Sequence, residues 1–472
     1  MKKVLKSITA LFLAVAMVLP LAACTTGGTQ QQSSSQSEKT AGQSAETGAD
    51  RLAKQKELNV MFVAGNFPES LQKVYKDFEK ENNVTVNYSV LGVDTYFQKM
   101  LVELSSNSDA YDLIYLMSPQ FIQYASNGWL TPLDDFIADK TITDDQILDI
   151  DGLMTSSVDA QRYQDKLYGI PVASLTCLLY YRKDLFEKAG LDPNKPPETW
   201  EQFAEYAKIL NKDGIAGAAM RGARSAGGSE GLIWHWPMVM EAMGGNFVKD
   251  FPSDMTPTLN TPEVIKSIEY YADILQNYSI KGATTCNYED ITVAVQQGDL
   301  AMWIDGAAIV KNYIDPEKSK TKEADVGFAP VPAGSAGRIA PLNVHSVNIP
   351  ANAKNKELAW KFIQWSTSED ILVRLATEGN LVTVSRKSVY DNEEFKSKNN
   401  IGNGEWLKAM NDSLADYANP NYRPLNPEWP EVADVISGHI SNVFAGQISA
   451  ADAMAKANDE VEKIYKEAGY LK

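Results

Sequence analysis

Cysteine is scarce in this sequence, with three residues among 472. Cys24, Cys177 and Cys286 form no CxxC pair, which excludes the usual thiol redox and zinc motifs. Spacing alone leaves open whether Cys177 and Cys286 pair in an oxidising exterior. Cys177 lies in the apolar run 175–179, and this setting favours a buried thiol.

Catalytic motifs are also missing. There is neither a G-x-S-x-G elbow nor a P-loop, and the three histidines lack metal-ligand spacing. Glycoside hydrolysis needs two carboxylates in environments that push their pKa values apart, and the acidic pairs of this chain lie in polar contexts. We therefore expect no catalytic residue, no metal and no cofactor, and an extracellular glycoside hydrolase is the alternative. The residues concerned are His235, His345, His439, Asp134-Asp135, Asp144-Asp145 and Glu393-Glu394.

Positive charge is in deficit. Lysine and arginine number 44 against 61 aspartates and glutamates, so the formal net charge is −17. This balance excludes nucleic acid as an expected partner. A solvated acidic surface on an exported protein explains the charge, and a cationic ligand such as a polyamine is the alternative.

Long apolar runs are absent except near the N-terminus, where Ile8 to Leu19 follows three lysines. This run is short for a membrane span, and with Leu21-Ala22-Ala23-Cys24 after it predicts a secretory signal over residues 1–23. Leu-Ala-Ala-Cys resembles the bacterial lipobox, which implies cleavage before Cys24 and a lipid on its sulfur. An ordinary signal peptide with an incidental cysteine is the alternative. Residues 24–56 are expected to be a flexible tether, because small polar residues dominate them.

Strands alternate with helices from residue 57 onward. Such alternation predicts an α/β fold, with a parallel sheet that carries helices on both faces. Ligands gather at the carboxyl ends of such strands, so the loops Gly65 to Pro68 and Met117 to Gln120 are expected to face a ligand. The first five elements are predicted as strand, helix, strand, helix and strand over residues 57–64, 69–81, 84–88, 96–104 and 112–116.

The stretch from Asp290 to Gly306 combines a helix, its glycine cap at Gly298 and a strand. Period-2 alternation in the strand places Trp303 and Asp305 on one face. A flat ring and a carboxylate at the rim of a sheet would suit a polar ligand with one apolar face, such as a sugar. A core tryptophan followed by a turn-forming Asp-Gly is the alternative interpretation.

Seven motifs, in this order, resemble those of extracellular solute-binding proteins of the maltose-binding type. These are the sugar-binding lipoproteins of ABC importers, and the resemblance spans about residues 57–468. The motifs are Tyr168-Gly169-Ile170-Pro171, Leu179 to Leu191, Pro197 to Phe203, Gln297 to Trp303, Gly327 to Pro332, Ile349 to Trp360 and Gly446 to Ala453.

The resemblance implies a two-lobe, periplasmic-binding-protein-like α/β fold with discontinuous lobes and a ligand between them. Lobe 1 is expected to hold 57–172 with 330–366, and lobe 2 to hold 173–329 with 367–472. A monomer anchored by Cys24 to the outer face of the cytoplasmic membrane would close around its ligand and dock on an ABC permease. Hinge crossings are expected near Pro171 to Ser174, Ala329 to Ala333 and Ser366 to Glu369.

The same resemblance implies a set of residues that contact a monosaccharide, oligosaccharide or polyol. Indole faces cover the C–H surfaces of a sugar ring, while Asp, Asn, Gln and Arg bind hydroxyl pairs. The alternatives are a hydrogen-bonded turn histidine for His345, an ion pair with an acidic residue for Arg423 and a hydrophobic staple for Trp429. Other ligand classes left open are a peptide, a polyamine and ferric iron, the last through Tyr180-Tyr181 or Tyr270-Tyr271. The expected contacts are Asn66, Phe67, Tyr96, Ser118, Gln120, Ser174, Trp234, Trp236, Trp303, Asp305, His345, Arg423 and Trp429.

Overall fold

The computed structural model describes residues 46–224 and 231–472. The expected signal peptide, Cys24 and most of the expected tether lie outside the described residues. Within the described ranges, no helix has both the length and the apolar character needed to cross a membrane.

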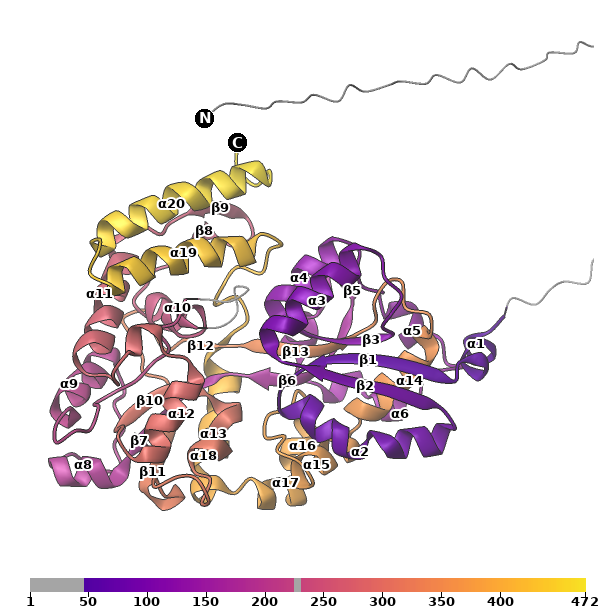
Figure 1. Ribbon diagram of the computed structural model, residues 1–472, viewed down its shortest axis with the longest axis horizontal. Helices are drawn as coiled ribbons and strands as arrows, with labels where there is room; N and C mark the ends of the chain where they lie inside the picture. Colours follow the sequence, from indigo (N-terminus) through magenta and orange to yellow (C-terminus); the bar gives the residue numbers. More distant parts are fainter. Residues whose placement is uncertain (1–45, 225–230) are drawn as a thin grey trace, which may run out of the picture. The chain divides into compact units, whose positions relative to one another are not determined.

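The first sheet has five strands in the order β2-β1-β3-β13-β6 (Figure 1). Strands β2, β1 and β3 run parallel, as the alternating pattern predicts. Strand β13, which belongs to a later passage of the chain, is antiparallel to both of its neighbours. The strands are β1 (Glu57–Val63), β2 (Thr85–Leu91), β3 (Leu113–Met117), β6 (Gly169–Leu175) and β13 (Asn343–Asn348).

Helices cover both faces of this sheet (Figure 1). In α2, Leu71, Val74 and Phe78 recur at helical spacing and are buried, so this stripe faces the sheet. Helices α2 and α4 begin directly at the carboxyl ends of β1 and β3, where loops are expected from the sequence. The covering helices are α2 (Asn66–Asn82), α3 (Val93–Ser105), α4 (Ser118–Ser126), α14 (Lys356–Thr367) and α15 (Glu369–Thr377).

The second sheet has three strands in the order β10-β7-β11 and is antiparallel throughout. This differs from the parallel sheet expected, because β7 continues from β6 after one residue, and β10 and β11 return on either side of it. Its strands and main helices are β7 (Cys177–Arg182), β10 (Met302–Gly306), β11 (Val326–Pro330), α8 (Lys183–Ala189), α9 (Trp200–Leu210), α10 (Leu232–Ala242), α11 (Pro262–Asn277), α12 (Tyr288–Gln297), α13 (Val310–Tyr313), α18 (Glu405–Asp412), α19 (Trp429–Phe444) and α20 (Ala450–Glu467).

Cys177 and Cys286 are both buried and do not form a disulfide with each other. Burial raises the pKa of the Cys286 thiol to about 11, so this sulfur stays protonated at neutral pH. The buried thiol expected for Cys177 from its apolar run is confirmed.

The chain passes from the first sheet to the second in places that differ in part from those expected. One passage, between β6 and β7, falls next to the expected crossing at Pro171 to Ser174. Helix α15 packs on α2 and α14, so no crossing occurs at Ser366 to Glu369. The first sheet with its helices forms the first half of the molecule, and the second sheet with its helices forms the second half. The chain leaves the first half only after α17, because α18 packs on β11. The other short elements are α5 (Asp134–Ala138), α6 (Asp145–Leu148), α7 (Thr155–Asp159), α16 (Lys387–Asp391), α17 (Glu393–Lys398), β4 (Arg162–Tyr163), β5 (Lys166–Leu167), β8 (Val248–Asp250), β9 (Asp254–Pro257), β12 (Ala340–Pro341) and β14 (Ala418–Asn419).

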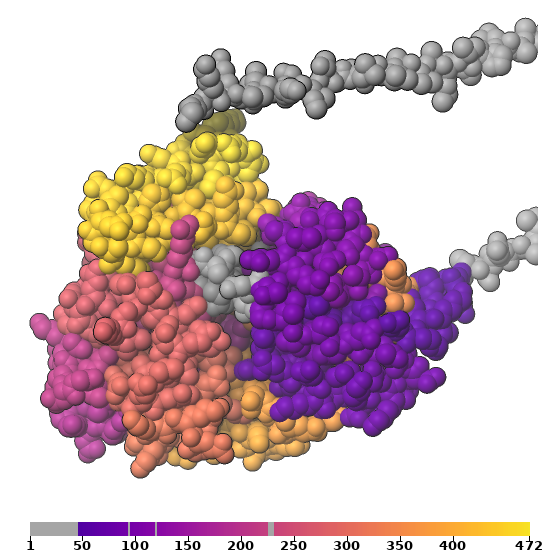
Figure 2. Space-filling view, viewed as in Figure 1, coloured from indigo at the N-terminus to yellow at the C-terminus, as the bar shows by residue number. Residues whose placement is uncertain are grey.

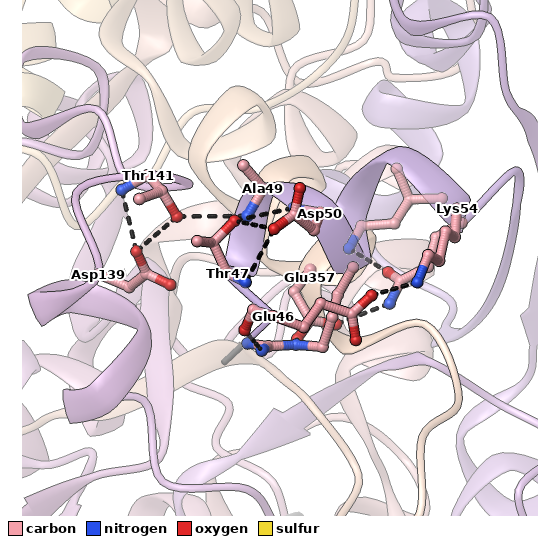
Figure 3. A network of polar contacts seen from close by, with 11 residues as sticks. Glu46, Thr47, Ala49, Asp50, Lys54, Asp139, Thr141 and Glu357 are labelled. Carbon is pink, nitrogen blue, oxygen red and sulfur yellow. Dashed lines mark hydrogen bonds and ion pairs between the residues drawn. The ribbon is translucent and has the colours of Figure 1, made fainter. Parts of the chain in front are cut away.

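The last part of the expected tether is a helix, α1 (Gly48–Lys54), that packs on α14. Thr47 caps it, and a polar network holds it to the first half of the molecule (Figure 3). Arg51 donates to one oxygen of Glu357, and the Gln55 amide donates to the other at 2.6 Å. The sequence missed this helix because it directly follows a long stretch rich in Ser, Gln, Thr and Gly.

Replacing Glu357 by alanine is expected to loosen α1 without unfolding the protein. The variant removes the shared acceptor of Arg51 and Gln55, and hydrogen bonds to a charged group contribute about 1.5–3 kcal/mol each at most. Hydrogen exchange of the amides of residues 48–54 should accelerate, while the melting temperature changes little. Lys54→Ala, which removes only the exposed pair with Glu46, is the matched control. Unchanged exchange in the Glu357 variant would show that apolar contacts alone hold the helix.

Glu241, near the end of α10, lies beside the short two-stranded sheet of β12 and β14. The Asn419 amide donates to its carboxylate at 2.8 Å, yet burial raises the pKa of Glu241 to about 8. The folded protein therefore keeps this proton between about pH 4.5 and pH 8, a range in which the unfolded chain has released it.

Because the folded state binds the extra proton, the contribution of Glu241 to stability falls as the pH rises from about 4.5 to 8. Glu241→Gln is expected to abolish this part of the pH dependence. Melting temperatures of both proteins are measured at pH 5, 7 and 9. We expect the two values to be similar at pH 5 and the glutamine variant to have the higher one at pH 9. Parallel profiles would mean that the carboxyl ionises normally.

Candidate functional site

A cavity of about 340 Å³ lies between the two sheets. Residues of the first half (indigo to violet) and the second half (coral) face one another across this region (Figure 2). The first half contributes the start of α2, the ends of β3 and β6, and the start of the antiparallel β13. The second half contributes residues near Arg221, α10, the start of α12 and the turn after β10. The lining residues that the argument uses are Asn66, Phe67, Tyr115, Asn343 and His345 on one side and Arg221, Trp234, Asn287, Tyr288 and Glu289 on the other.

The wall from the first sheet is aromatic with polar tips. The rings of Phe67 and Tyr115 stack with centroids 6.0 Å apart. The Tyr115 hydroxyl lies 2.9 Å from Nδ1 of His345, and the amide of Asn343 lies 3.4 Å from Nε2. Burial lowers the pKa of His345 to about 3, so its imidazole is neutral at physiological pH. This wall offers flat faces together with neutral hydrogen-bonding groups.

The wall from the second sheet carries an indole, a phenol and a guanidinium. Trp234, on α10, meets the edge of Tyr422, with ring centroids 5.7 Å apart. The Arg423 guanidinium lies 6.0 Å from the Trp234 ring. Arg221 places its guanidinium 5.4 Å from the centroid of Tyr288. These contacts fix the three lining side chains before any ligand arrives.

Asp305 stands behind this wall and holds Arg221. Its Oδ1 accepts from Nε of Arg221 at 3.1 Å, from Nη2 of the same guanidinium, and from the Gly306 amide at 2.7 Å. His235 Nε2 lies 3.5 Å from the same oxygen. The pKa of Asp305 is well below its usual range: burial opposes ionisation, but the charge of Arg221 and the His235 contact outweigh it. The carboxylate is therefore ionised.

One hydrogen bond spans the cavity directly. The amide of Asn66, at the start of α2, donates to the carbonyl of Ala308 at 2.9 Å. Asn66 belongs to the first half, and Ala308 follows β10 in the second. The two walls of the cavity are therefore in direct contact at this point.

Four of the expected contact residues line the cavity, namely Asn66, Phe67, Trp234 and His345. The first two follow β1 at the carboxyl end of the first sheet, and His345 lies on β13 beside the end of β3. Both positions follow from the rule that ligands gather at strand ends. Trp234 lies on α10, within the glycine-rich residues 213–246, for which the sequence predicts a loop and the start of a helix near a ligand-facing surface.

Four other expected residues hold the frame of the first half. The Tyr96 hydroxyl donates to the carbonyl of Tyr115 at 2.6 Å and accepts from its amide. Ser118 bonds both backbone groups of Val344. Ser174 lies between the hydroxyls of Ser157 and Ser385. Gln120 is buried on α4 and is not part of the lining.

The remaining five lie behind or away from the cavity wall. Trp303 is fully buried and stacks on Tyr180, with centroids 5.3 Å apart and ring planes 2° from parallel. Trp236 donates from Nε1 to Ser267, and Trp429 packs on Phe247. Arg423 lies against the ring of the lining residue Trp234, and Asp305 accepts hydrogen bonds from the lining residues Arg221 and Gly306. The expectation that Trp303 faces the cleft is therefore not met, because β10 is buried on both of its faces.

Several lining residues were not expected from the sequence. Tyr115 and Asn343 lie inside stretches already recognised as a strand and a turn, so counting alternate residues toward the strand end could have found them. The start of α12 contributes Asn287, Tyr288 and Glu289, which directly precede the stretch from Asp290 to Gly306. Arg221 lies within the glycine-rich residues 213–246 and carries no local signal. Its role depends on Asp305, which is 84 residues away in the chain.

The paired tyrosines do not form a ferric-iron site. Tyr180 donates to the Gly306 carbonyl, Tyr181 to Pro193, Tyr270 to Trp200 and Tyr271 to Arg221. Their phenols are engaged with separate backbone groups, and burial raises the pKa of each. Among residues 46–224 and 231–472, no group of three or more His, Cys, Asp or Glu side chains could hold a metal ion.

Comparison with known proteins matches residues 64–371 to a family described as bacterial extracellular solute-binding protein. The chain is 26% identical to a mannitol-binding protein of Pseudomonas aeruginosa over 434 residues, which cover 88% of this chain and 94% of the relative.

Solved structures share the fold. A solute-binding protein of an ABC transporter from Agrobacterium vitis S4, with bound D-mannitol, superposes with a TM-score of 0.74 at 26% identity, covering 88% of this chain and 100% of that one. Maltose-bound MalE3 of T. maritima superposes with a TM-score of 0.73 at 23% identity, covering 86% and 99%. The α/β, two-lobe fold class expected from the sequence is confirmed.

Proposed function

Because this chain belongs to the bacterial extracellular solute-binding proteins, we propose that it captures a carbohydrate between its two lobes for an ABC importer. Its relatives are binding proteins and not enzymes, so the chain delivers the ligand unchanged. The observation that carries the proposal is the cavity itself, in which aromatic faces alternate with amides, an imidazole and a guanidinium.

The chemistry of the lining supports a small polyhydroxyl ligand. Trp234, Phe67 and Tyr288 present flat apolar surface, and Asn66, Asn287 and Asn343 can each bind hydroxyl groups through one donor and one acceptor side. A cavity of about 340 Å³ is small for ligand sites, which span roughly 300–1,000 Å³. A monosaccharide or a linear polyol therefore fits this cavity better than an oligosaccharide. The mannitol-binding relatives agree with this choice.

Closure of the two lobes would supply the affinity. A ligand that contacts both walls binds the closed state better than the open state, and only that difference shifts the population. The passages near Thr176, in residues 331–339 and after α17 are the proposed hinge. Lipidation at Cys24 after removal of residues 1–23 would keep a monomer on the outer face of the membrane, beside its permease.

A thermal-shift panel tests the function. The purified chain is mixed with pentitols, hexitols, aldoses, ketoses and disaccharides, with spermidine and a tripeptide mixture as other ligand classes. A ligand at one hundred times its dissociation constant adds about 2.7 kcal/mol to the free energy of unfolding and raises the melting temperature accordingly. We expect a polyol or monosaccharide to give the largest rise. A shift with spermidine or peptide only would contradict the proposal.

A further inference from the structure

The charges around the cavity are unevenly placed. Among the described lining residues, Arg221 and Glu289 are the two of charged type, and His345 is held neutral by its low pKa. A cavity that offers an arginine could bind either a hydroxyl group or an anion such as a carboxylate. The surroundings of Arg221 decide between the two.

The charge of Arg221 is already met by Asp305. The two side chains are 6% and 0% exposed, so water screens their interaction little. Asp305 is absent from the lining and reaches the guanidinium from behind, while Arg221 itself lines the cavity. An anion entering from the front would therefore compete with a carboxylate that is fixed within hydrogen-bonding distance of the same cation.

Arg221 cannot turn away to serve another partner. Its backbone amide donates to Nδ1 of His235 at 3.0 Å, and its carbonyl accepts from the Tyr271 hydroxyl at 2.7 Å. The Tyr288 ring lies 5.4 Å from the guanidinium, measured to the ring centroid. The contacts from α10 and α11 hold the backbone of Arg221, and the ring from α12 lies against its guanidinium.

Helix ends do not restore a net positive field. Helices α2 and α12 begin at the cavity wall, where their amide ends carry a partial positive charge. The first turn of α12, however, contains Glu289 and Asp290, and that of α2 contains Glu69. The formal net charge of −17 further opposes the approach of an anion.

From this arrangement we propose that Asp305 sets the charge class of the ligand without touching it. By neutralising Arg221 from behind, it makes the cavity accept an uncharged polyhydroxyl solute and reject the carboxylate of the same carbon skeleton. Arg221 then donates to a hydroxyl oxygen of the neutral ligand, and Asp305 acts as its positioning residue. This inference rests on the proposed function, since it concerns the same cavity.

The test compares three probes of one skeleton by titration calorimetry: D-mannitol, D-mannonate and D-mannonamide. If another neutral solute binds more tightly in the panel, the corresponding three compounds of its skeleton replace them. The neutral alcohol and amide are expected to bind the unaltered protein at least tenfold more tightly than the carboxylate. Because the amide and the carboxylate have the same shape, this result would assign the rejection to charge. Equal binding of amide and carboxylate would overturn the inference with no variant needed.

Asp305→Asn should then reverse the preference. The alcohol is expected to lose no more than a few-fold in affinity, while the carboxylate gains, so that their ratio falls at least tenfold. Asp434→Asn removes a carboxylate from an exposed pair, in which Nε and Nη2 of Arg224 donate to the two oxygens of Asp434, and should leave the ratio unchanged. A folded Asp305→Asn protein with the original ratio would overturn the inference. Binding of acids alone would also overturn it and leave solute capture intact, whereas binding of no sugar, polyol or acid would instead refute the proposed function.

Discussion

Replacing Trp303 by alanine is expected to lower the free energy of unfolding by about 3–5 kcal/mol, the usual cost of truncating a buried tryptophan. The indole is fully buried, stacks on Tyr180 and meets Tyr313 edge-on, with centroids 5.4 Å apart. Because Trp303 pairs with Tyr180 across β10 and β7, the cavity left by truncation would lie inside the second sheet. Chemical denaturation, with the midpoint and slope fitted separately, measures the loss.

Trp303→Phe provides the control for this experiment, because it keeps an aromatic ring against Tyr180 and should recover more than half of the loss. At temperatures where the alanine variant is folded, its dissociation constant for the best panel ligand should stay within about threefold of the original. A variant that unfolds like the original protein but no longer binds ligand would contradict the packing seen around Trp303. The ring would then face the ligand, as the sequence alone led us to expect.

Trp303 shows which part of the site the sequence could not supply. Alternation along a strand tells which side chains share a face, and it correctly groups Trp303 with Asp305. It does not tell what covers that face. All five residues of β10 are buried, since helices lie over both sides of the sheet, and a strand end in this setting has the same residue pattern as one at an open rim.

The fold was more accessible than the site. Amphipathic spacing in α2 and α11, the glycine cap of α12 and the ordered set of motifs each constrain local structure, so the two-lobe α/β class could be predicted without any contact map. For α10 the sequence indicated only a loop and the start of a helix within residues 213–246, because glycines flank the helix and Pro237 lies within it, and both residue types weigh against a helix. Helix α1 was missed because it directly follows a long stretch rich in Ser, Gln, Thr and Gly.

Site residues that depend on long-range partners had no local signal. Arg221 lines the cavity only because Asp305 holds it, and the two are far apart in sequence. Asn66, Phe67 and His345 were predictable, because each lies at or beside the carboxyl end of a strand in the first sheet. The difference reflects geometry: strand ends are a property of sequence pattern, whereas ion-pair partners are a property of the folded chain.

Trp234 and Trp236 lie two residues apart on α10, and the structure predicts that removal of the first weakens ligand binding whereas removal of the second lowers stability. Trp234 lines the cavity with Arg423 on its ring, whereas Trp236 is fully buried and donates to Ser267 at 2.9 Å. Residues two apart on a helix point in different directions, so one indole faces the ligand and the other the core of the second half.

Trp234→Ala is expected to weaken binding of the best panel ligand by about 1–3 kcal/mol, a roughly 5- to 150-fold rise in the dissociation constant, because a ligand-facing aromatic surface is lost. Trp236→Ala should instead lower the melting temperature and leave the dissociation constant nearly unchanged in the folded protein. Calorimetric titration and thermal unfolding of both variants separate the two effects. Trp234→Phe, which keeps a flat ring, should retain part of the affinity. Equal losses of affinity in both alanine variants would mean that α10 acts as a unit and that Trp234 has no direct contact with the ligand.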